Sequence, residues 1–352
     1  MKNFLQLHLL THYPPANLNR DDLGRPKTAK MGGVDRLRIS SQSLKRHWRT
    51  SDIFASAMAG HVGTRTKKLG VKAYEDLCAQ GLDEKKAIKF AQAIAGEFGK
   101  LKKEDKEKPL EGLEIEQLVH ISPAEQQNID NLVAEIAKSG TAPTKEQLQL
   151  FRKDETAVDI ALFGRMLASK PEYNVEAAAQ VAHALTVHGV AIESDFFTAV
   201  DDFDQYKADA GSSHLGETGF AAGLFYTYIC INKTELLNNL NGDTELANKA
   251  LQALTEAAIK VAPKGKQNSF GSHGYANYVL AEIGDQQPRS LSAAFLKPIM
   301  QDADYLDASI KQLNRQKENF DKVYGNCSDA KYALNALEGE GSMSELMAFI
   351  CE

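Results

Sequence analysis

Fourteen consecutive residues, RLRISSQSLKRHWR at positions 36–49, combine cationic and hydroxyl side chains in a pattern that suits an anionic ligand. Five of these residues are basic: Arg36, Arg38, Lys45, Arg46 and Arg49. No acidic residue alternates with them, as is usual on a surface covered by salt bridges. Arg and Lys donate hydrogen bonds to phosphate oxygens, and Ser and Gln add further donors. The stretch therefore predicts binding of a phosphate or of a nucleic-acid backbone.

A short strand and a helix would have to position these side chains. Residues 36–40 alternate, with Leu37 and Ile39 on one face and the basic residues and a serine on the other, which predicts a strand. From Ser41 onward the period is helical, with an apolar stripe at Leu44, Trp48, Ala55 and Met58. We expect Trp48 to belong to the core.

The start of this helix offers anion-binding groups of its own. Ser40 or Ser41 can cap it, and its first backbone N–H groups and the positive end of its dipole favour an anion. Gln42, Lys45 and Arg49 have the spacing i, i+3, i+7 and share one face. These donors form a row long enough to follow several phosphates. The alternative is a capped amphipathic helix whose basic side is only solvated.

The charge of the chain is distributed unevenly. The 352 residues have a net charge of -6, but residues 1–57 contain ten Lys and Arg against four Asp and Glu. The remaining residues contain 31 against 43. A basic segment on an acidic body favours a local anion site over general adhesion to nucleic acid, and it lets one copy's basic region face another copy's acidic one.

Several other classes of protein are excluded or disfavoured by the sequence. The length allows one large domain or two smaller ones. The N-terminus does not resemble a signal peptide, and no apolar run is long enough to span a bilayer, so we expect a cytoplasmic protein with no membrane partner. The four cysteines have no CxxC spacing, which disfavours a zinc site or a disulfide framework.

Motifs of common enzymes are absent as well. The sequence has no GxxxxGK[ST], HExxH or GxSxG, and His183 and His188 are five residues apart, which is wrong for two ligands on one helix face. We therefore expect no catalytic residue, no metal and no cofactor.

Along the chain, periodicity predicts an α+β core with a helical insertion. Residues 3–10 alternate as a strand, and residues 12–33 form a Pro/Gly/Asn/Asp-rich arm with too little apolar content to pack as an element. Residues 60–153 are expected to be mostly helical, with helices at 83–98 and 123–138 around a charged loop at 100–112. Residues 158–167 look like a strand, and 175–188 are ambiguous. Two extended segments, at 195–202 and 220–232, are expected to be joined by a long excursion.

A set of motifs in fixed order resembles a known family. The motifs are NLNRDD (17–22), GG (32–33), RISSQSLKR (38–46), DIALFGRM (159–166), AHALTVH (182–188), FTAVDD (197–202) and SSHLGETGFAAGLFYTY (212–228). In combination they resemble the backbone subunit of Cascade, the type I-E CRISPR-associated complex (CasC family). The resemblance extends to about residue 300 and is poor at 60–150 and in the last fifty residues.

The resemblance implies a modified RNA-recognition-motif (ferredoxin-like) palm with a helical fingers insertion and a β-hairpin thumb. On this chain the palm would comprise residues 1–59, 156–193 and 224–352, the last including a C-terminal helical region. The fingers would comprise residues 60–155 and the thumb residues 194–223. Copies would stack head-to-tail along a CRISPR RNA, together with other Cascade subunits, and would present its bases to target DNA in antiviral defence.

The resemblance also implies roles for individual residues. RNA-backbone contacts would come from the arm, the strand, the turn and the helix: Arg20, Lys27, Arg38, Ser40, Gln42, Lys45, Arg46 and Arg49. Met166, in the GRM segment, would also bind RNA by packing under it. An apolar wedge on the thumb would displace one guide base: Phe197, Thr198, Val200 and Leu215. Lys264 and Lys266 are expected to lie near nucleic acid, with a plain surface turn as the alternative.

Two rival functions remain open from the sequence. In related type III complexes the equivalent subunit cleaves target RNA with a palm-loop aspartate, so Asp21 and Asp22 could hold Mg²⁺ in a metal-dependent RNase. A small-molecule phosphate enzyme built on the helix terminus would need a general base that the sequence does not identify. The segment TGFAAGLF (218–225) lacks the basic residue and the middle aromatic of the RNA-recognition signature, so base stacking on the sheet is not expected.

Overall fold

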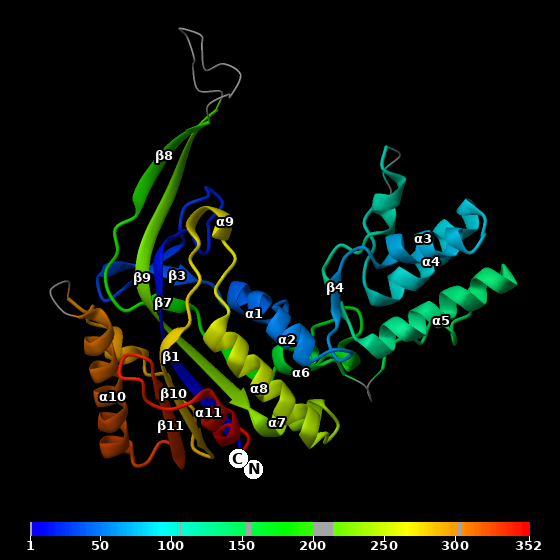
Figure 1. The fold of residues 1–352 in the computed structure, drawn as a ribbon. Helices are drawn as coiled ribbons and strands as arrows, with labels where there is room; N and C mark the ends of the chain where they lie inside the picture. Colours follow the sequence, from blue (N-terminus) through cyan, green and yellow to red (C-terminus); the bar gives the residue numbers. More distant parts are fainter. Residues whose placement is uncertain (1, 104, 106, 153–155, 200–213, 301–303) are drawn as a thin grey trace, which may run out of the picture. The chain divides into compact units, whose positions relative to one another are not determined.

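The protein is represented by a computed structural model that describes every residue except 1, 104, 106, 153–155, 200–213 and 301–303 (Figure 1). The chain divides into two compact units. The first, here called the sheet unit, comprises Met1–Phe54, Gln180–Asn232 and Leu251–Glu352. The second, here called the helical unit, comprises Ala55–Ala179 and Lys233–Ala250.

The fold is a mixed α/β fold built on an antiparallel sheet, which in the described part of the chain has nine strands. Seven of them follow the order β11-β10-β1-β9-β7-β3-β2, and β6 and β8 pair with β9 off this path. The strands are β1 (Phe4–Ala16), β2 (Thr28–Met31), β3 (Val34–Ile39), β6 (Ala179–Val181), β7 (Ala184–Thr186), β8 (Glu193–Ala199), β9 (His214–Asn232), β10 (Ala276–Gly284) and β11 (Ala330–Asn335).

The predicted first strand is confirmed, and it is a central strand that pairs with β9 and β10 along most of its length. Its alternation of Leu with Gln6 and His8 does not separate a core face from a solvent face, because Gln6 and His8 are also buried. Their polar atoms are paired: Tyr228 donates to the Gln6 side-chain oxygen at 2.8 Å, and the His8 ring contacts Tyr226 and Glu282. Both faces of the sheet are therefore covered at β1.

The C-terminal part of the sheet unit covers the face that carries Leu10, Tyr226 and Leu280. Leu291 and Phe295, around the 3-10 helix η3, and Ile310 and Leu313 of α10 pack there. The helices of the sheet unit are α1 (Ser41–Arg49), α9 (Gln267–Phe270), η3 (Ser292–Phe295), α10 (Tyr305–Tyr324) and α11 (Met343–Phe349). Two further helices, α2 (Asp52–Ala57) and α8 (Thr244–Lys260), contribute residues to both units.

The helical unit has a separate core, in which apolar residues of α3, α4 and α5 meet. The predicted helices at 83–98 and 123–138 are confirmed as α4 and α5. A capping box starts α5: the Ser122 hydroxyl accepts from the Glu125 backbone N–H, and the Glu125 carboxylate accepts from Ser122 N. The elements are β4 (Thr64–Thr66), α3 (Leu69–Ala79), α4 (Glu84–Phe98), η1 (Pro109–Leu113), β5 (Val119–Ile121), α5 (Pro123–Ser139), α6 (Val158–Phe163), η2 (Pro171–Tyr173) and α7 (Lys233–Asn239).

The strand predicted at 158–167 is wrong, because residues 158–163 form the short helix α6. Five consecutive residues of it are buried, and a continuous apolar run has no period that separates a buried helix from a buried strand. The helix expected to run past Ser41 is interrupted, since the Ser51 hydroxyl donates to Trp48 O at 2.7 Å and accepts from Phe54 N at 3.2 Å. Trp48 is buried as expected.

The arm at 12–33 is more ordered than predicted. Strand β1 continues into it as far as Ala16, and β2 pairs with β3 through Met31 and Val34. The ambiguous segment 175–188 contains two three-residue strands, β6 and β7. The two extended segments expected before 232 are confirmed as β8 and β9. No helix in the described ranges is long and apolar enough to cross a membrane.

Candidate nucleic-acid interface

Arg36, the first cation of the basic stretch, is fully buried and holds the fold together. Its Nη1 donates to Thr186 O at 2.9 Å, its Nη2 to Phe295 O at 2.9 Å and its Nε to Met31 O at 3.2 Å. Met31, the third acceptor, directly precedes the tight turn at residues 32–33. The guanidinium is therefore directed at backbone carbonyls inside the sheet unit and not at an external ligand.

The next element, α1, starts where the sequence predicted. Ser40 is its N-cap, and the Ser40 hydroxyl accepts from Ser43 N at 3.4 Å. Ser40 N in turn donates to the Asn19 side-chain oxygen at 2.9 Å, which ties the start of the helix to the arm. Ser40 is buried, so its role in this structure is to fix the turn. The first turn of α1 contains no acidic residue, so nothing on the helix opposes an anion there.

The arm is held in shape by an Asx-type turn and a short backbone bridge. Asp21 Oδ1 accepts from Leu23 N at 3.0 Å and from Arg25 N at 2.9 Å. Arg20 pairs with Pro26 as an isolated antiparallel bridge, and Lys27 N donates to Asn19 O at 2.8 Å. The arm therefore returns on itself and brings Arg20 and Lys27 close to the start of α1.

A groove of about 530 Å³ lies between the arm, α1 and the loop before α9. Arg20, Ser43, His47 and Lys264 are among the residues that line it. Gly265 closes one end, because a Cβ there would meet Leu18 O at 2.3 Å, so only glycine allows the loop backbone to approach the arm this closely. The groove thus combines the exposed cations Arg20 and Lys264 with the carboxylates Asp21 and Asp22 and with polar groups of α1.

Arg38 and Lys27 form a second basic cluster on the strand side. Arg38 Nη1 lies 3.3 Å from His183 Nδ1, and its Nε donates to Thr28 O at 3.4 Å. Partial burial, and then the nearby charges of Arg38 and Lys27, lower the pKa of His183. A neutral imidazole can accept from the guanidinium, so the cluster remains cationic at neutral pH.

The remaining sequence-predicted donors of α1 lie on its surface. Gln42 and Arg46 are exposed, and Lys45 and Arg49 are partly exposed. Burial lowers the pKa of Lys45, which nevertheless lies in the basic row beside Arg46 and Arg49. Lys266 adopts a left-handed backbone conformation with φ 53°, and its carbonyl accepts from Ser269 N and Phe270 N, so it starts α9.

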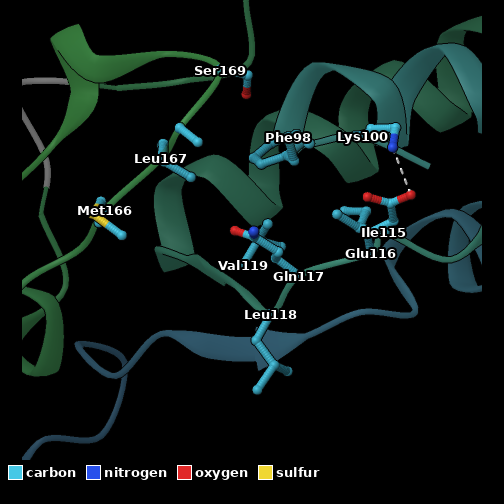
Figure 2. A pocket seen from close by; sticks show the side chains of 12 residues that line it. Phe98, Lys100, Ile115, Glu116, Gln117, Leu118, Val119, Met166, Leu167 and Ser169 are labelled. Carbon is cyan, nitrogen blue, oxygen red and sulfur yellow. Dashed lines mark hydrogen bonds and ion pairs between the residues drawn. The ribbon is translucent and has the colours of Figure 1, made fainter. Parts of the chain in front are cut away.

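Met166 belongs to the helical unit, and its side chain is 82% exposed. Figure 2 shows it among the side chains that line a pocket. The residues on either side hold it outward: Arg165 pairs with the buried Glu125 at 2.7 Å, and Leu167 is buried while its N–H donates to Asn174. Met166 and the exposed Leu118 border a cavity of about 230 Å³. This environment suits contact with an apolar surface.

The β8–β9 hairpin carries the predicted thumb residues that the structure describes. Phe197 pairs with Gly216, and a Cβ at Gly216 would meet the Phe197 ring at 2.3 Å, so the ring lies over the glycine. Thr198 is exposed and pairs with Leu215. Because Phe197 and Thr198 are successive strand residues, they lie on opposite faces of the hairpin. Val200 lies outside the described residues.

Three polar residues that line the groove were not predicted from the sequence as site residues: Asn19, Ser43 and His47. Asn19 connects the arm to Ser40 N, and His47 faces the groove one helical turn after Ser43. The spacing of Ser43 and His47 is i, i+4, which could have indicated a shared face. No pattern in the sequence indicates that the Lys264 loop forms the opposite wall, because that contact joins residues more than 200 positions apart.

A comparison with models of known protein families finds one that matches almost the whole chain. The family described as CT1975-like protein matches residues 5–348. The chain belongs to the CT1975-like family. No curated protein sequence matches it.

Solved structures agree with the assignment of this CT1975-like protein. A chain of a CRISPR RNA-guided surveillance complex, pre-nicking, is 29% identical over 99% of both chains, with a TM-score of 0.85. A chain of another CRISPR RNA-guided surveillance complex is 24% identical over 99% of both chains, with a TM-score of 0.75, which shows the shared fold. The resemblance to the Cascade backbone subunit, found from the motifs, is confirmed.

Proposed function

We propose that this CT1975-like protein is the guide-binding backbone subunit of a Cascade surveillance complex. Copies would polymerise head-to-tail along a CRISPR RNA, beside other Cascade subunits, and present its bases for pairing with target DNA. The observation that carries the proposal is the groove in the sheet unit, where Arg20 and Lys264 face polar groups of α1. Membership of the family and the similarity to a surveillance-complex chain support it.

In this proposal the sheet unit contains the palm, a modified RNA-recognition-motif fold. The helices between residues 60 and 155 would be the fingers, and the β8–β9 hairpin would be the thumb. The central antiparallel strands β1, β9 and β10, with helices packed on the sheet, are compatible with this type of palm.

Binding would be directed at the RNA backbone and would not depend on sequence. In RNA-recognition modules, aromatic side chains on the open sheet face stack on bases. Here Tyr226 and Tyr278 are buried beneath Leu291, Phe295 and the residues of α10 that cover the sheet, so bases cannot stack on them. The donors that remain accessible are Arg, Lys and Gln side chains at the arm, β3 and α1, which fit phosphate oxygens.

The thumb and Met166 would act on the bases instead. Phe197 is 41% exposed although its ring lies over Gly216, so part of the ring remains available to a base or to a neighbouring copy. An apolar wedge can hold a base out of the stack because unstacking costs only about 1–3 kcal/mol. A guide divided into short ordered segments would be ready to pair with target DNA.

We propose that the subunit is not catalytic. The alternative is a metal-dependent RNase through Asp21 and Asp22, but Oδ1 of Asp21 already accepts from two backbone N–H groups and serves the turn of the arm. Among the described residues, no group of three or more His, Cys, Asp or Glu side chains is arranged to hold a metal ion.

Purification with and without a guide RNA tests the proposal. The protein produced with its guide should have a high ratio of absorbance at 260 nm to that at 280 nm and should migrate as an oligomer. Added Mg²⁺ should leave labelled RNA intact. A protein that remains monomeric and free of RNA would contradict the backbone role, and cleavage lost in Asp21→Asn would support the RNase instead.

A further inference from the structure

The ring of His47 has a defined orientation in the groove. Its Nδ1 lies 2.7 Å from the carbonyl oxygen of Ser43, one turn earlier in α1. A carbonyl oxygen can only accept, so the hydrogen of the neutral ring is on Nδ1. The other ring nitrogen, Nε2, then carries a lone pair and can only accept a hydrogen bond. Within the described residues, no group donates to it.

The surroundings keep this ring neutral. Partial burial is the largest effect that lowers the pKa of His47; the hydrogen bond to the Ser43 carbonyl opposes it, and the positive charges of Lys264 and Arg46 lower the pKa further. The charges of Lys264 and Arg46 make a further positive charge on the ring unfavourable. His47 Nε2 therefore presents an unused lone pair on the α1 side of a groove that is also lined by the cations Arg20 and Lys264 and by the carboxylates Asp21 and Asp22.

An acceptor here has no use for a phosphate, because phosphate oxygens are themselves acceptors. An RNA strand brings one donor that accompanies every phosphate, the 2′-hydroxyl of the ribose. We propose that His47 Nε2 accepts a hydrogen bond from a guide ribose 2′-hydroxyl and so makes the groove select RNA over DNA. This inference rests on the proposed function and adds a specificity-determining residue to it.

Two considerations favour the ribose, and not a base, as the group that donates to His47. Arg20 and Lys264 would hold consecutive phosphates, and the ribose lies between two phosphates in the strand. A base amine would make binding depend on sequence, whereas a 2′-hydroxyl is present at every nucleotide. Acceptance from the ribose is thus compatible with binding of any guide.

The test compares oligouridine RNA with 2′-fluoro-oligouridine, which keeps the RNA-like sugar pucker but has no 2′ donor. Affinities are measured by fluorescence anisotropy for the wild-type chain, His47→Ala and His47→Gln. The hydrogen bond from the ribose to His47 should make the wild-type chain bind RNA about 5-fold more tightly than the fluoro analogue, the factor expected for one hydrogen bond. His47→Ala should weaken binding of RNA and remove this 5-fold preference for RNA over the fluoro analogue. His47→Gln, whose amide oxygen can accept, should restore part of the preference.

His12→Ala is the matched control, since His12 is an exposed histidine of β1 that does not line the groove. It should retain the wild-type preference, and melting curves should show that all variants fold. An equal loss for RNA and the fluoro analogue in His47→Ala would assign His47 to a phosphate and overturn the proposal. An unchanged preference would overturn it too. Failure of the wild type to bind either oligonucleotide would instead contradict the proposed function.

Discussion

Arg36 and Arg46 lie ten residues apart in the same basic stretch, and their replacement should have opposite consequences. Arg36→Met should destabilise the sheet unit, because Arg36 is fully buried and donates to the carbonyls of Met31, Thr186 and Phe295. Arg46→Met should leave stability unchanged, because Arg46 is exposed on α1. Methionine is used in both because it keeps the length and the apolar part of the side chain.

The expected loss in Arg36→Met follows from its three acceptors. Each buried carbonyl that loses its donor costs about 1–3 kcal/mol. Removing a buried charge recovers part of this desolvation cost, which leaves a net loss of roughly 3–5 kcal/mol. A loss of this size lowers the melting temperature by about 6–20 °C, at about 2–4 °C per kcal/mol for a unit of this size.

Two measurements distinguish the variants. Thermal melts followed by circular dichroism should show the loss for Arg36→Met alone. RNA affinity should then be measured at several salt concentrations, below the melting temperature. The slope of log affinity against log salt concentration should equal that of the wild type for Arg36→Met and should be flatter by about 0.7 for Arg46→Met. If Arg36→Met melts like wild type and flattens the salt slope, then Arg36 contacts RNA and its assignment as an internal support is wrong.

Three further predictions concern other parts of the protein. Lys45→Ala and Arg49→Ala should each weaken guide binding equally for all guide sequences and flatten the salt slope by about 0.7, and an unchanged slope in the double variant would place the RNA elsewhere. Phe197→Ser should leave guide binding intact but reduce capture of complementary DNA; equal DNA capture by wild type and variant would refute the wedge. Burial lowers the pKa of His8 in the folded state, so below about pH 6.5 only the unfolded chain takes up this proton. The free energy of unfolding should therefore fall with decreasing pH in this range, by at most about 1.4 kcal/mol per pH unit. His8→Gln should show a smaller loss in pH-dependent denaturation, and an identical pH profile would contradict this assignment.

Local patterns in the sequence predicted the elements where local physics decides. The N-cap at Ser40, the helix that carries Leu44 and Trp48, and the strand around Leu7 all form as expected. The error at 158–167 has a different origin. Five consecutive residues of α6, Val158 to Leu162, are buried, so neither a two-residue nor a 3.6-residue period appears in them.

The division of the cations between core and surface could not be predicted from the sequence. Alternation puts Arg36 and Arg38 on the same face of β3, yet Arg36 is fully buried and Arg38 is partly exposed. The difference arises because η3 and the residues after it pass over the sheet at Arg36. Gly32 permits this approach: its φ is 64°, and a Cβ there would meet Leu296 O at 1.7 Å. Such contacts join positions more than 250 residues apart, and no local pattern records them.

Two kinds of basic residue contribute to the candidate site. A cation that is buried and donates to backbone carbonyls, such as Arg36, is not accessible to a phosphate and contributes to the shape of the site. A cation at the groove, such as Arg20 or Lys264, contributes to affinity in proportion to the counterions that it displaces. His47 differs from both because its Nε2, the ring nitrogen that does not bond to the Ser43 carbonyl, can only accept. A groove in which donors face phosphates and one acceptor faces a ribose would bind any RNA sequence while still distinguishing RNA from DNA.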